Sequence, residues 1–410
     1  MMAATKTFEY AVRDKAGKLV KGRVDAPNQA AVANRLRDMG LAAVSISEVS
    51  TGGLNAEISI PGFGGNKITL KDLAVMSRQL ATMIDSGLSL LRALSILADQ
   101  TESKALAKVI GQVRNDVEVG GAFSTALNKH PDVFPPLMIN MVKAGEVGGF
   151  LDQVLVSVAD NFEAEVKLRG KIKSAMTYPV VVFVVAILAT TGMLLFIVPI
   201  FAGMFSTLGG TLPLPTRILM MLSQGLKITI IPIVVVLIGF SIWWSRHKND
   251  RSIRERVDPW KLKVPVFGNL FRKIAVSRFT RNFGTMIHAG VPLLQALDIV
   301  GETSGNLVIE RAAKAVQESV RRGESLAGPL SQHPVFPPMV VQMMAVGEDT
   351  GALDTMLGKV ADFYDQEVES TTEQLTSLIE PLMIVVIGAI VGSMVIAMYM
   401  PIFGIFNLIS

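Results

Sequence analysis

The 410-residue sequence contains no cysteine and is poor in charged residues. Without cysteine it can form no disulfide, no thiolate metal site and no cysteine nucleophile. Charged residues make up 18% of the chain and hydrophobic residues 50%, whereas soluble globular proteins carry about 25% charged residues. The composition therefore argues against an ordinary soluble protein. The N-terminal stretch has no apolar core, so we expect no cleaved signal peptide there.

Motifs for catalysis and nucleotide binding are also missing from the sequence. The four histidines are scattered and show no HExxH spacing, and no GxSxG, P-loop or dinucleotide fingerprint occurs. The glycine-rich segment GFGGNK at 62–67 fails the P-loop spacing. We therefore predict a protein that is not an enzyme, with no catalytic residue, no cofactor site and no nucleic-acid partner.

Three long runs without charge stand out instead. The first lies between Lys173 and Arg217, the second between Lys227 and Arg246, and the third follows Glu380. A helix needs about 20 apolar residues to span a bilayer, and these runs are too long for helices buried in a soluble core. We predict membrane-spanning helices at 176–201, 226–245 and 379–403.

The basic residues beside these runs predict the orientation of the chain. Four Lys and Arg residues at 167–173 precede the first run, and seven at 246–263 follow the second. By the positive-inside rule, the N-terminus and both flanking domains are cytoplasmic, and the 202–225 loop and the C-terminus are outside. Trp243 and Trp244, at the inner end of the second run, are typical of an interfacial anchor.

Outside the runs, the pattern predicts a mostly α-helical membrane protein with a small N-terminal α/β module. Alternating apolar residues predict strands at 7–14, 18–25 and 42–48, with a helix at 28–39. From Thr69, which forms a capping-box-like start with Asp72, the periodicity becomes helical. The predicted order is an α/β module at 1–50, a glycine-rich linker at 51–68, and antiparallel helical bundles at 69–173 and 246–375.

The two bundles are copies of one unit. RQLATMIDSGLSLLRAL at 78–94 is repeated as RNFGTMIHAGVPLLQAL at 281–297, and FPPLMINMVKAGEVGGFLDQVL at 134–155 as FPPMVVQMMAVGEDTGALDTML at 336–357. The match continues to the end of the following span, where PIF occurs at 199–201 and 401–403. The sequence therefore predicts an internal duplication of a bundle plus the span that follows it.

Each copy of this phrase contains a pair of acids, which are the strongest site candidates. Glu146 and Asp152 flank a glycine break in the first copy, and Glu348 and Asp354 do so in the second. Acids near helix ends most often cap a helix or favour its dipole. A more specific alternative is that the acids bind a divalent cation such as Ca²⁺, although two carboxylates are few for such an ion. The third interpretation is that the acids form part of a docking site for a partner protein.

A further acid lies where the third span begins. Glu380 precedes Pro381, at the position where the first copy has Tyr178 before Pro179. Ionisable groups in membrane helices often serve function, although a group at the membrane edge can also reach water. We take these four residues as a candidate partner site at the membrane edge.

The segment KIKSAMTYPVVVFVVAILATTGMLLFIVP at 171–199 resembles the signature of the bacterial secretion protein F family. The N-terminal module and both Gly-Glu phrases resemble this family too. The second copy keeps Pro381 and Pro401 but has Glu373 and Glu380 in place of the signature's Lys and Tyr. The residues in signature positions are Lys171, Ile172, Ala175, Met176, Tyr178, Pro179, Ile197, Val198 and Pro199.

The resemblance implies an inner-membrane platform protein of a type IV pilus or type II secretion machine. Its expected partners are a cytoplasmic hexameric assembly ATPase, in some machines a retraction ATPase, pilin or pseudopilin membrane helices, inner-membrane alignment proteins, and further copies of the same chain. The first repeat and the N-terminal module favour the pilus branch. A transporter is the competing class, but only three spans and no charge near a bilayer midplane argue against it. A membrane receptor is disfavoured by the short external loop.

Overall fold

The computed structural model describes residues 6–13, 19–26, 31–32, 43–48, 68–207, 213–248 and 250–409. The chain divides into two compact units, Met1–Lys67 and Ile68–Ser410.

The first unit contains a three-stranded antiparallel sheet. Strand β1 (Lys6–Arg13) lies between β2 (Leu19–Ala26) and β3 (Ala43–Glu48) and pairs with both. These strands agree with the predicted ones. The predicted helix at 28–39 lies outside the described residues except for two helical positions at 31–32, and so does the predicted linker except for residue 68. The α/β character of this unit therefore stays a prediction.

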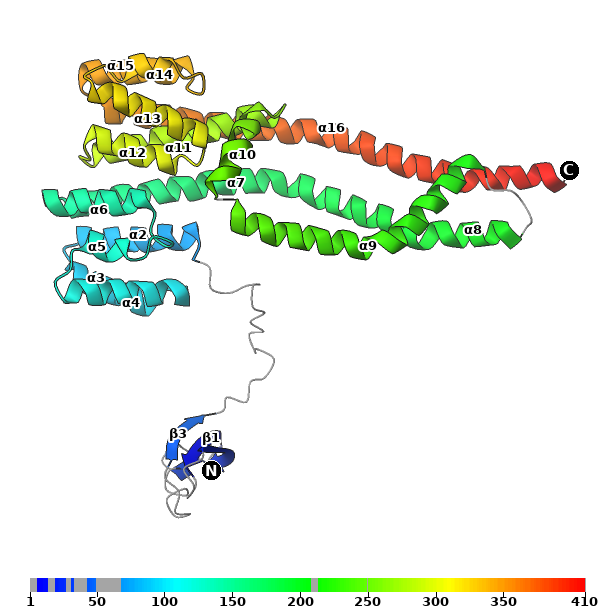
Figure 1. The fold of residues 1–410 in the computed structure, drawn as a ribbon, viewed down its shortest axis with the longest axis horizontal. Helices are drawn as coiled ribbons and strands as arrows, with labels where there is room; N and C mark the ends of the chain where they lie inside the picture. Colours follow the sequence, from blue (N-terminus) through cyan, green and yellow to red (C-terminus); the bar gives the residue numbers. More distant parts are fainter. Residues whose placement is uncertain are drawn as a thin grey trace. The chain divides into compact units, whose positions relative to one another are not determined.

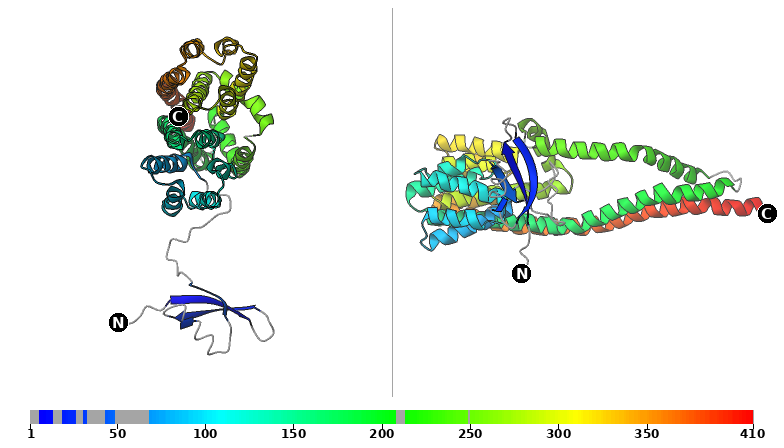
Figure 2. Two further views of the ribbon diagram at one scale, coloured as in Figure 1. Left: turned by 90° about the vertical axis from the view of Figure 1, so that its left-hand side faces the viewer. Right: turned by 90° about the horizontal axis from the view of Figure 1, so that it is seen from below.

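The second unit consists of two helical bundles lying side by side, from which long helices extend in one direction (Figure 1, Figure 2). The first bundle contains α2 (Leu70–Asp85), α3 (Leu90–Gln100), α4 (Lys104–Glu118), α5 (Phe123–Asn128) and α6 (Pro136–Gly148). The second contains α10 (Arg251–Lys263), α11 (Phe267–His288), α12 (Leu293–Thr303), α13 (Leu307–Arg321), α14 (Ala327–Ser331) and α15 (Pro338–Thr350). The extended part contains α7 (Leu151–Gly192), the π-helical η1 (Met193–Ile197), α8 (Val198–Thr207), α9 (Leu214–His247) and α16 (Leu353–Ile409).

Local signals in the sequence set the helix ends in both bundles. Thr69 Oγ1 accepts a hydrogen bond from the Asp72 amide at 3.2 Å, and Asp72 Oδ2 accepts one from the Thr69 amide at 2.8 Å. This confirms the predicted capping box. Helices α6 and α15 end at Gly149 and Gly351, whose φ angles of 77° and 70° lie in the left-handed region that glycine adopts without strain. The sharp turn into α7 and α16 depends on these two glycines.

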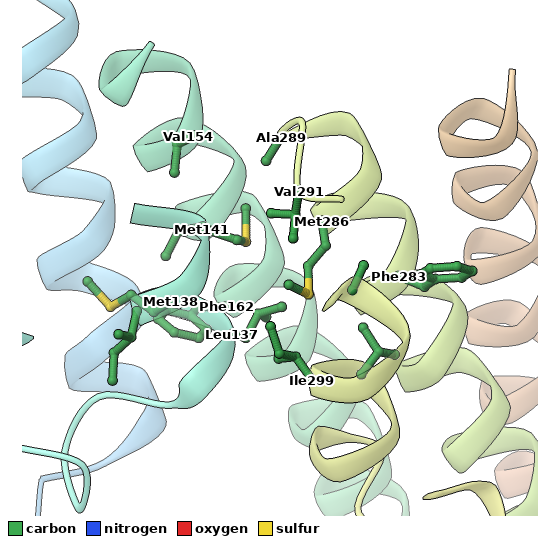
Figure 3. Close-up of a cluster of buried hydrophobic side chains, with 14 of the residues drawn as sticks. Leu137, Met138, Met141, Val154, Phe162, Phe283, Met286, Ala289, Val291 and Ile299 are labelled. Atoms are coloured by element: carbon green, nitrogen blue, oxygen red, sulfur yellow. The ribbon is translucent and has the colours of Figure 1, made fainter. Parts of the chain in front are cut away.

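One apolar core runs through both bundles. Phe134 and Phe336, which are equivalent in the repeat, are both buried, and the rings of Phe279 and Phe336 lie 5.0 Å apart. Between the bundles, side chains of α6 such as Met141 face side chains of α11 such as Met286 (Figure 3). Burial of each such large side chain is worth about 1.5–3 kcal/mol. The bundles therefore form one packed body.

The helices that close the bundles continue as the membrane spans. At 1.5 Å per residue, the 42 residues of α7 are about 63 Å long and the 57 residues of α16 about 86 Å. Both lengths exceed the roughly 30 Å of a hydrocarbon core. Three helical stretches, Leu151–Gly203, Leu214–His247 and Leu353–Met400, are long and apolar enough to cross a membrane. The chain is a multi-pass, mostly α-helical membrane protein.

The segment expected as an external loop at 202–225 is largely helical. Helix α8 extends to Thr207, and α9 begins at Leu214 rather than at 226. Pro213 and Pro215 do not prevent this, because a proline at a helix N-terminus removes only an amide that has no intrahelical partner. With about 51 Å of helix, α9 is longer than a bilayer core requires.

The close approach of α15 to α16 generates a prediction at Gly347. A Cβ atom there would lie 2.9 Å from the backbone Cα of Leu353. We expect Gly347→Ala to push the two helices apart and lower stability by about 1–3 kcal/mol. Thermal unfolding of the full chain in detergent, followed by circular dichroism, measures the change.

The matched control is Gly358→Ala, on α16, where a Cβ would meet nothing within 4 Å. Alanine favours a helix by about 0.5–1 kcal/mol over glycine, so this variant should melt at the wild-type temperature or above it. Equal melting temperatures for both variants would contradict the tight packing at Gly347.

Candidate functional site

The glutamates of the two Gly-Glu phrases bind the start of a neighbouring short helix. Glu146 Oε1 accepts a hydrogen bond from the Phe123 amide at 2.5 Å, and its Oε2 accepts one from the Ser124 amide at 3.0 Å. In the second repeat, both oxygens of Glu348 accept from the Leu326 amide at 2.9 Å. These amides lie at the N-termini of α5 and α14, where backbone donors have no intrahelical acceptor. Each glutamate therefore caps a helix remote in sequence.

The glycine before each glutamate explains the Gly-Glu pairing. A Cβ on Gly145 would lie 2.9 Å from the side chain of Val154 in α7. The small residue lets α6 pack closely on α7, while the next residue points its carboxylate towards α5. A carboxylate at a helix N-terminus also interacts favourably with the helix dipole. The capping hypothesis thus accounts for the recurrence of both residues, with α5 and α14 rather than their own helices being capped.

Asp152 and Asp354, the second acid of each pair, do not share the capping role of the glutamates. Asp152 and Asp354 occupy the first turns of α7 and α16. Asp354 Oδ2 lies 3.0 Å from Nδ1 of His288, and this hydrogen bond is the main cause that lowers the pKa of the Asp354 carboxyl. His288 occupies the position of Asp85 in the first repeat. Nothing in the local sequence singles out this histidine, because its partner comes from a distant helix.

A groove between the two repeats brings these polar groups together. It is lined by Asp85, Asp152, Asp160, His288 and Asp354, together with small polar and apolar residues. Within the described residues, no group of three or more His, Asp or Glu side chains is arranged to hold a metal ion. The predicted cation site at the four acids therefore stays a hypothesis, and the glutamates already have backbone donors as partners.

An arginine clamp that the sequence analysis missed recurs in both repeats. Arg78 on α2 donates to Asp160 at 2.5 Å and to both oxygens of Glu163 on α7 at 2.7 Å. The hydrogen bond from Arg78 lowers the pKa of Glu163.

The second repeat reproduces the clamp. Arg281 on α11 bonds Asp362 at 3.1 Å and Asp365 at 2.7 Å on α16. The usable signal was the repeated arginine at the start of RQLATMI and RNFGTMI, matched by two acids one helical turn apart. The clamps fasten α2 and its equivalent α11 to the helices of their own repeats that enter the membrane, α7 and α16.

The membrane-edge residues also come together. Tyr178, Pro179 and Glu380 line one groove between α7 and α16, whose other lining residues are apolar, and Pro381 follows Glu380 in α16. The groove measures about 420 Å³. Just before it, Lys171 pairs with Glu369 across the two helices. The two repeats thus remain in contact from the bundles to the start of the spans.

Comparison with known proteins places these features in a family. The family model described as type II secretion system protein F matches residues 76–199 and 279–401, and the model of its N-terminal domain matches residues 2–47. The two separate matches reproduce the internal duplication. They also cover the predicted N-terminal module.

Several relatives align along nearly the whole chain. The type IV pilus assembly protein PilC of Thermus thermophilus is 46% identical over 404 residues, covering 98% of this chain and 99% of the relative. PilC of Myxococcus xanthus is 44% identical over 405 residues, covering 98% and 95%. The type II secretion system protein F of Xanthomonas campestris is 34% identical over 406 residues, covering 98% and 99%.

The remote caps generate a prediction for Glu146. Glu146→Ala leaves the Phe123 and Ser124 amides without their acceptor, and we expect a loss of about 1–3 kcal/mol in stability. Glu146→Gln keeps one carbonyl acceptor and should lose less. Thermal unfolding in detergent compares both with Glu118→Ala, which removes an exposed acid at the end of α4. Wild-type melting of Glu146→Ala combined with lost assembly would favour partner docking instead.

The first arginine clamp generates a prediction of pH dependence. Because Arg78 lowers the pKa of Glu163 in the folded chain, the unfolded chain binds more protons at acidic pH. The stabilisation is therefore full above pH 4.5, the ordinary pKa of this carboxyl, and is lost as pH falls through the lowered value. Arg78→Met should cost roughly 0.5–1 kcal/mol near pH 7, since the pair is partly exposed.

The measurement is the difference in melting temperature between wild type and Arg78→Met from pH 7 to pH 3. This difference should narrow as the pH falls below 4.5. Arg114→Met is the control, because Arg114 donates to the neutral Asn115 amide and its effect should not change with pH. A pH-independent difference for Arg78→Met would contradict the clamp.

Proposed function

Because the chain belongs to the family of type II secretion system protein F, we propose that it is the inner-membrane platform protein of a type IV pilus assembly machine. The choice between the pilus and the secretion machine rests on sequence identity. Relatives named as type IV pilus assembly proteins reach 46% and 44%, whereas the secretion proteins F reach 34% and 33% at similar coverage.

The architecture supports a role in transmitting motion. The two bundles are continuous with spans through α7 and α16, and the arginine clamps tie the bundles to these helices. A displacement of a bundle is therefore passed to the membrane helices through continuous secondary structure. The sequence has no nucleotide-binding motif, so the energy comes from a partner, which we take to be a cytoplasmic hexameric ATPase.

In this proposal, both bundles and the N-terminal unit are cytoplasmic and the C-terminus is outside. The basic residues at 167–173 and 246–263 support this orientation. The groove at Tyr178, Pro179 and Glu380 is apolar apart from its edge, which suits the membrane helix of a pilin subunit entering or leaving the fibre base. Inner-membrane alignment proteins complete the set of expected partners.

The second candidate is the platform of a type II secretion system, which assembles a pseudopilus. Relatives with this name cover 98% of the chain, and the matched family model carries the same description. The two candidates share the fold and the type of partner. They differ in which fibre is built.

An in-frame deletion separates the two candidates. We expect loss of surface pili, seen by electron microscopy, with unchanged secretion of exoproteins, and recovery of pili when the gene is restored. A tagged chain should co-purify with a hexameric ATPase from the same cells. Loss of secretion with intact pili would support the second candidate, and a deletion strain that retains both would overturn the platform role.

A further inference from the structure

The contact between the two bundles joins unlike parts of the repeat. Helices α6 and α7 of the first bundle pack on α11 and α12 of the second, and apolar side chains meet between them (Figure 3). In the duplicated sequence, α6 and α7 correspond to α15 and α16, whereas α11 and α12 correspond to α2 and α3. Apart from the contact of α7 with its own equivalent, α16, the first bundle therefore contributes the end of its repeat and the second contributes the beginning. Contacts of this head-to-tail kind are heterologous.

A heterologous contact leaves one copy of each surface unused. Helices α14 and α15 lie at one end of the stacked bundles, and α3 and α4 lie at the other (Figure 1, Figure 2). We name the two surfaces after their helices. The α15/α16 face comprises Met339, Gln342, Met343 and Phe363, and the α2/α3 face comprises Val75, Gln79, Met83, Leu88 and Arg92.

The α15/α16 face keeps the apolar character of its buried equivalent. On α6, the two side chains at the corresponding positions, Leu137 and Met141, are buried where the two bundles meet. On α15 the equivalents are again apolar but only partly buried. Single exposed apolar residues need no explanation, whereas a contiguous row indicates an interaction surface. The corresponding pairs are Leu137 with Met339 and Met141 with Met343.

The α2/α3 face shows the same relation from the other side. Met286 and Val291 are buried beneath the first bundle, with 0% and 4% of their surface exposed. Their equivalents are Met83, which is partly buried, and Leu88, which is 37% exposed. The α15/α16 face and the α2/α3 face thus resemble the two apolar surfaces that meet between the bundles. They lie at opposite ends of the stack.

The polar groups at the centre of the contact are replaced by less polar residues on the free faces. Between the bundles, the Asn161 amide donates to Asn282 at 3.0 Å. The equivalent of Asn161 is Phe363, which is 43% exposed, and the equivalent of Asn282 is Gln79. One turn before Gln79 lies Val75, which is 49% exposed. Arg278, the equivalent of Val75, pairs with Glu165 across the contact at 3.4 Å, whereas Glu367, the equivalent of Glu165, pairs with Lys273 on α11. This ion pair is therefore not repeated, and the free faces present Phe363 and Val75 as exposed apolar side chains.

We infer that the α15/α16 face of one copy of this chain docks on the α2/α3 face of a second copy, repeating the contact between its own bundles. Copies inserted by the same charge rule share one orientation in the membrane, so they are related by rotation about the membrane normal. A heterologous contact under that constraint generates a ring where its rotation closes. The inference concerns self-association alone and does not depend on a pilin or an ATPase.

The absence of native cysteine makes a cross-linking test direct. Two differently tagged chains, one with Gln79→Cys and one with Phe363→Cys, are co-expressed and treated in native membranes with a short bis-maleimide. We expect a cross-linked product containing both tags, and none when either variant is expressed alone. Asn161→Cys with Asn282→Cys in one chain is the positive control, since these side chains touch.

Two results would overturn the inference. The first is a cross-link from a single variant alone, which requires a symmetric contact between like surfaces. The second is no mixed product while the control reacts, which would mean that the two faces do not meet.

A charge placed on the face gives an independent test. Phe363→Asp should reduce the mass of the detergent-solubilised complex measured by light scattering, without changing its melting temperature. Val119→Asp is the matched control, because Val119 is 85% exposed and its equivalent, Arg322, is exposed in the second bundle. An unchanged mass for Phe363→Asp, or an equal loss in both variants, would contradict docking through Phe363.

Discussion

The whole arrangement depends on two helices that do not stop at the membrane surface. Helices α7 and α16 each begin at a glycine corner, form a side of a bundle and continue into the apolar run. A helix keeps nearly all its backbone hydrogen bonds internal, so it can pass from water to lipid. Pro179 leaves the carbonyl of Ala175 without its helical donor, and this oxygen accepts a hydrogen bond from Thr376 on α16 at 3.5 Å. The orientation of each bundle relative to the membrane is therefore set by the helix itself. The arginine clamps fasten α2 to α7 through Arg78 and α11 to α16 through Arg281.

The duplication provides two bundles, each joined to its own membrane helix, and the two bundles pack against each other. The glutamates at 146 and 348 hold the short helices α5 and α14 in place, which keeps the corner before each long helix rigid. The contact between the bundles uses the end of one repeat and the beginning of the next. In the proposed function, a body built in this way passes displacement from bundle to bundle. Its free ends carry apolar residues equivalent to those buried in the contact already formed inside.

Much of the fold could be predicted from sequence, because its signals are local. The duplication, the three apolar runs, the Thr69 capping box and the strands of the first unit all followed from spacing and composition. The remote partners could not, since nothing local says that Glu146 reaches Phe123 or that Asp354 meets His288. Helix α9 extends into the expected loop because prolines at its start are compatible with a helix. The repeat establishes which faces are equivalent, but only packing shows which pair is used.

The continuity of α16 across the membrane edge is the central claim, and a distance measurement tests it most directly. Spin labels at Lys359→Cys and Ser393→Cys lie on either side of Pro381 in this helix. For an unbroken helix, pulsed electron paramagnetic resonance in lipid nanodiscs should give one narrow distribution near about 50 Å, at 1.5 Å per residue. A broad distribution, or one centred well below that distance, would show that the helix breaks at the membrane edge and would contradict rigid coupling between bundle and span.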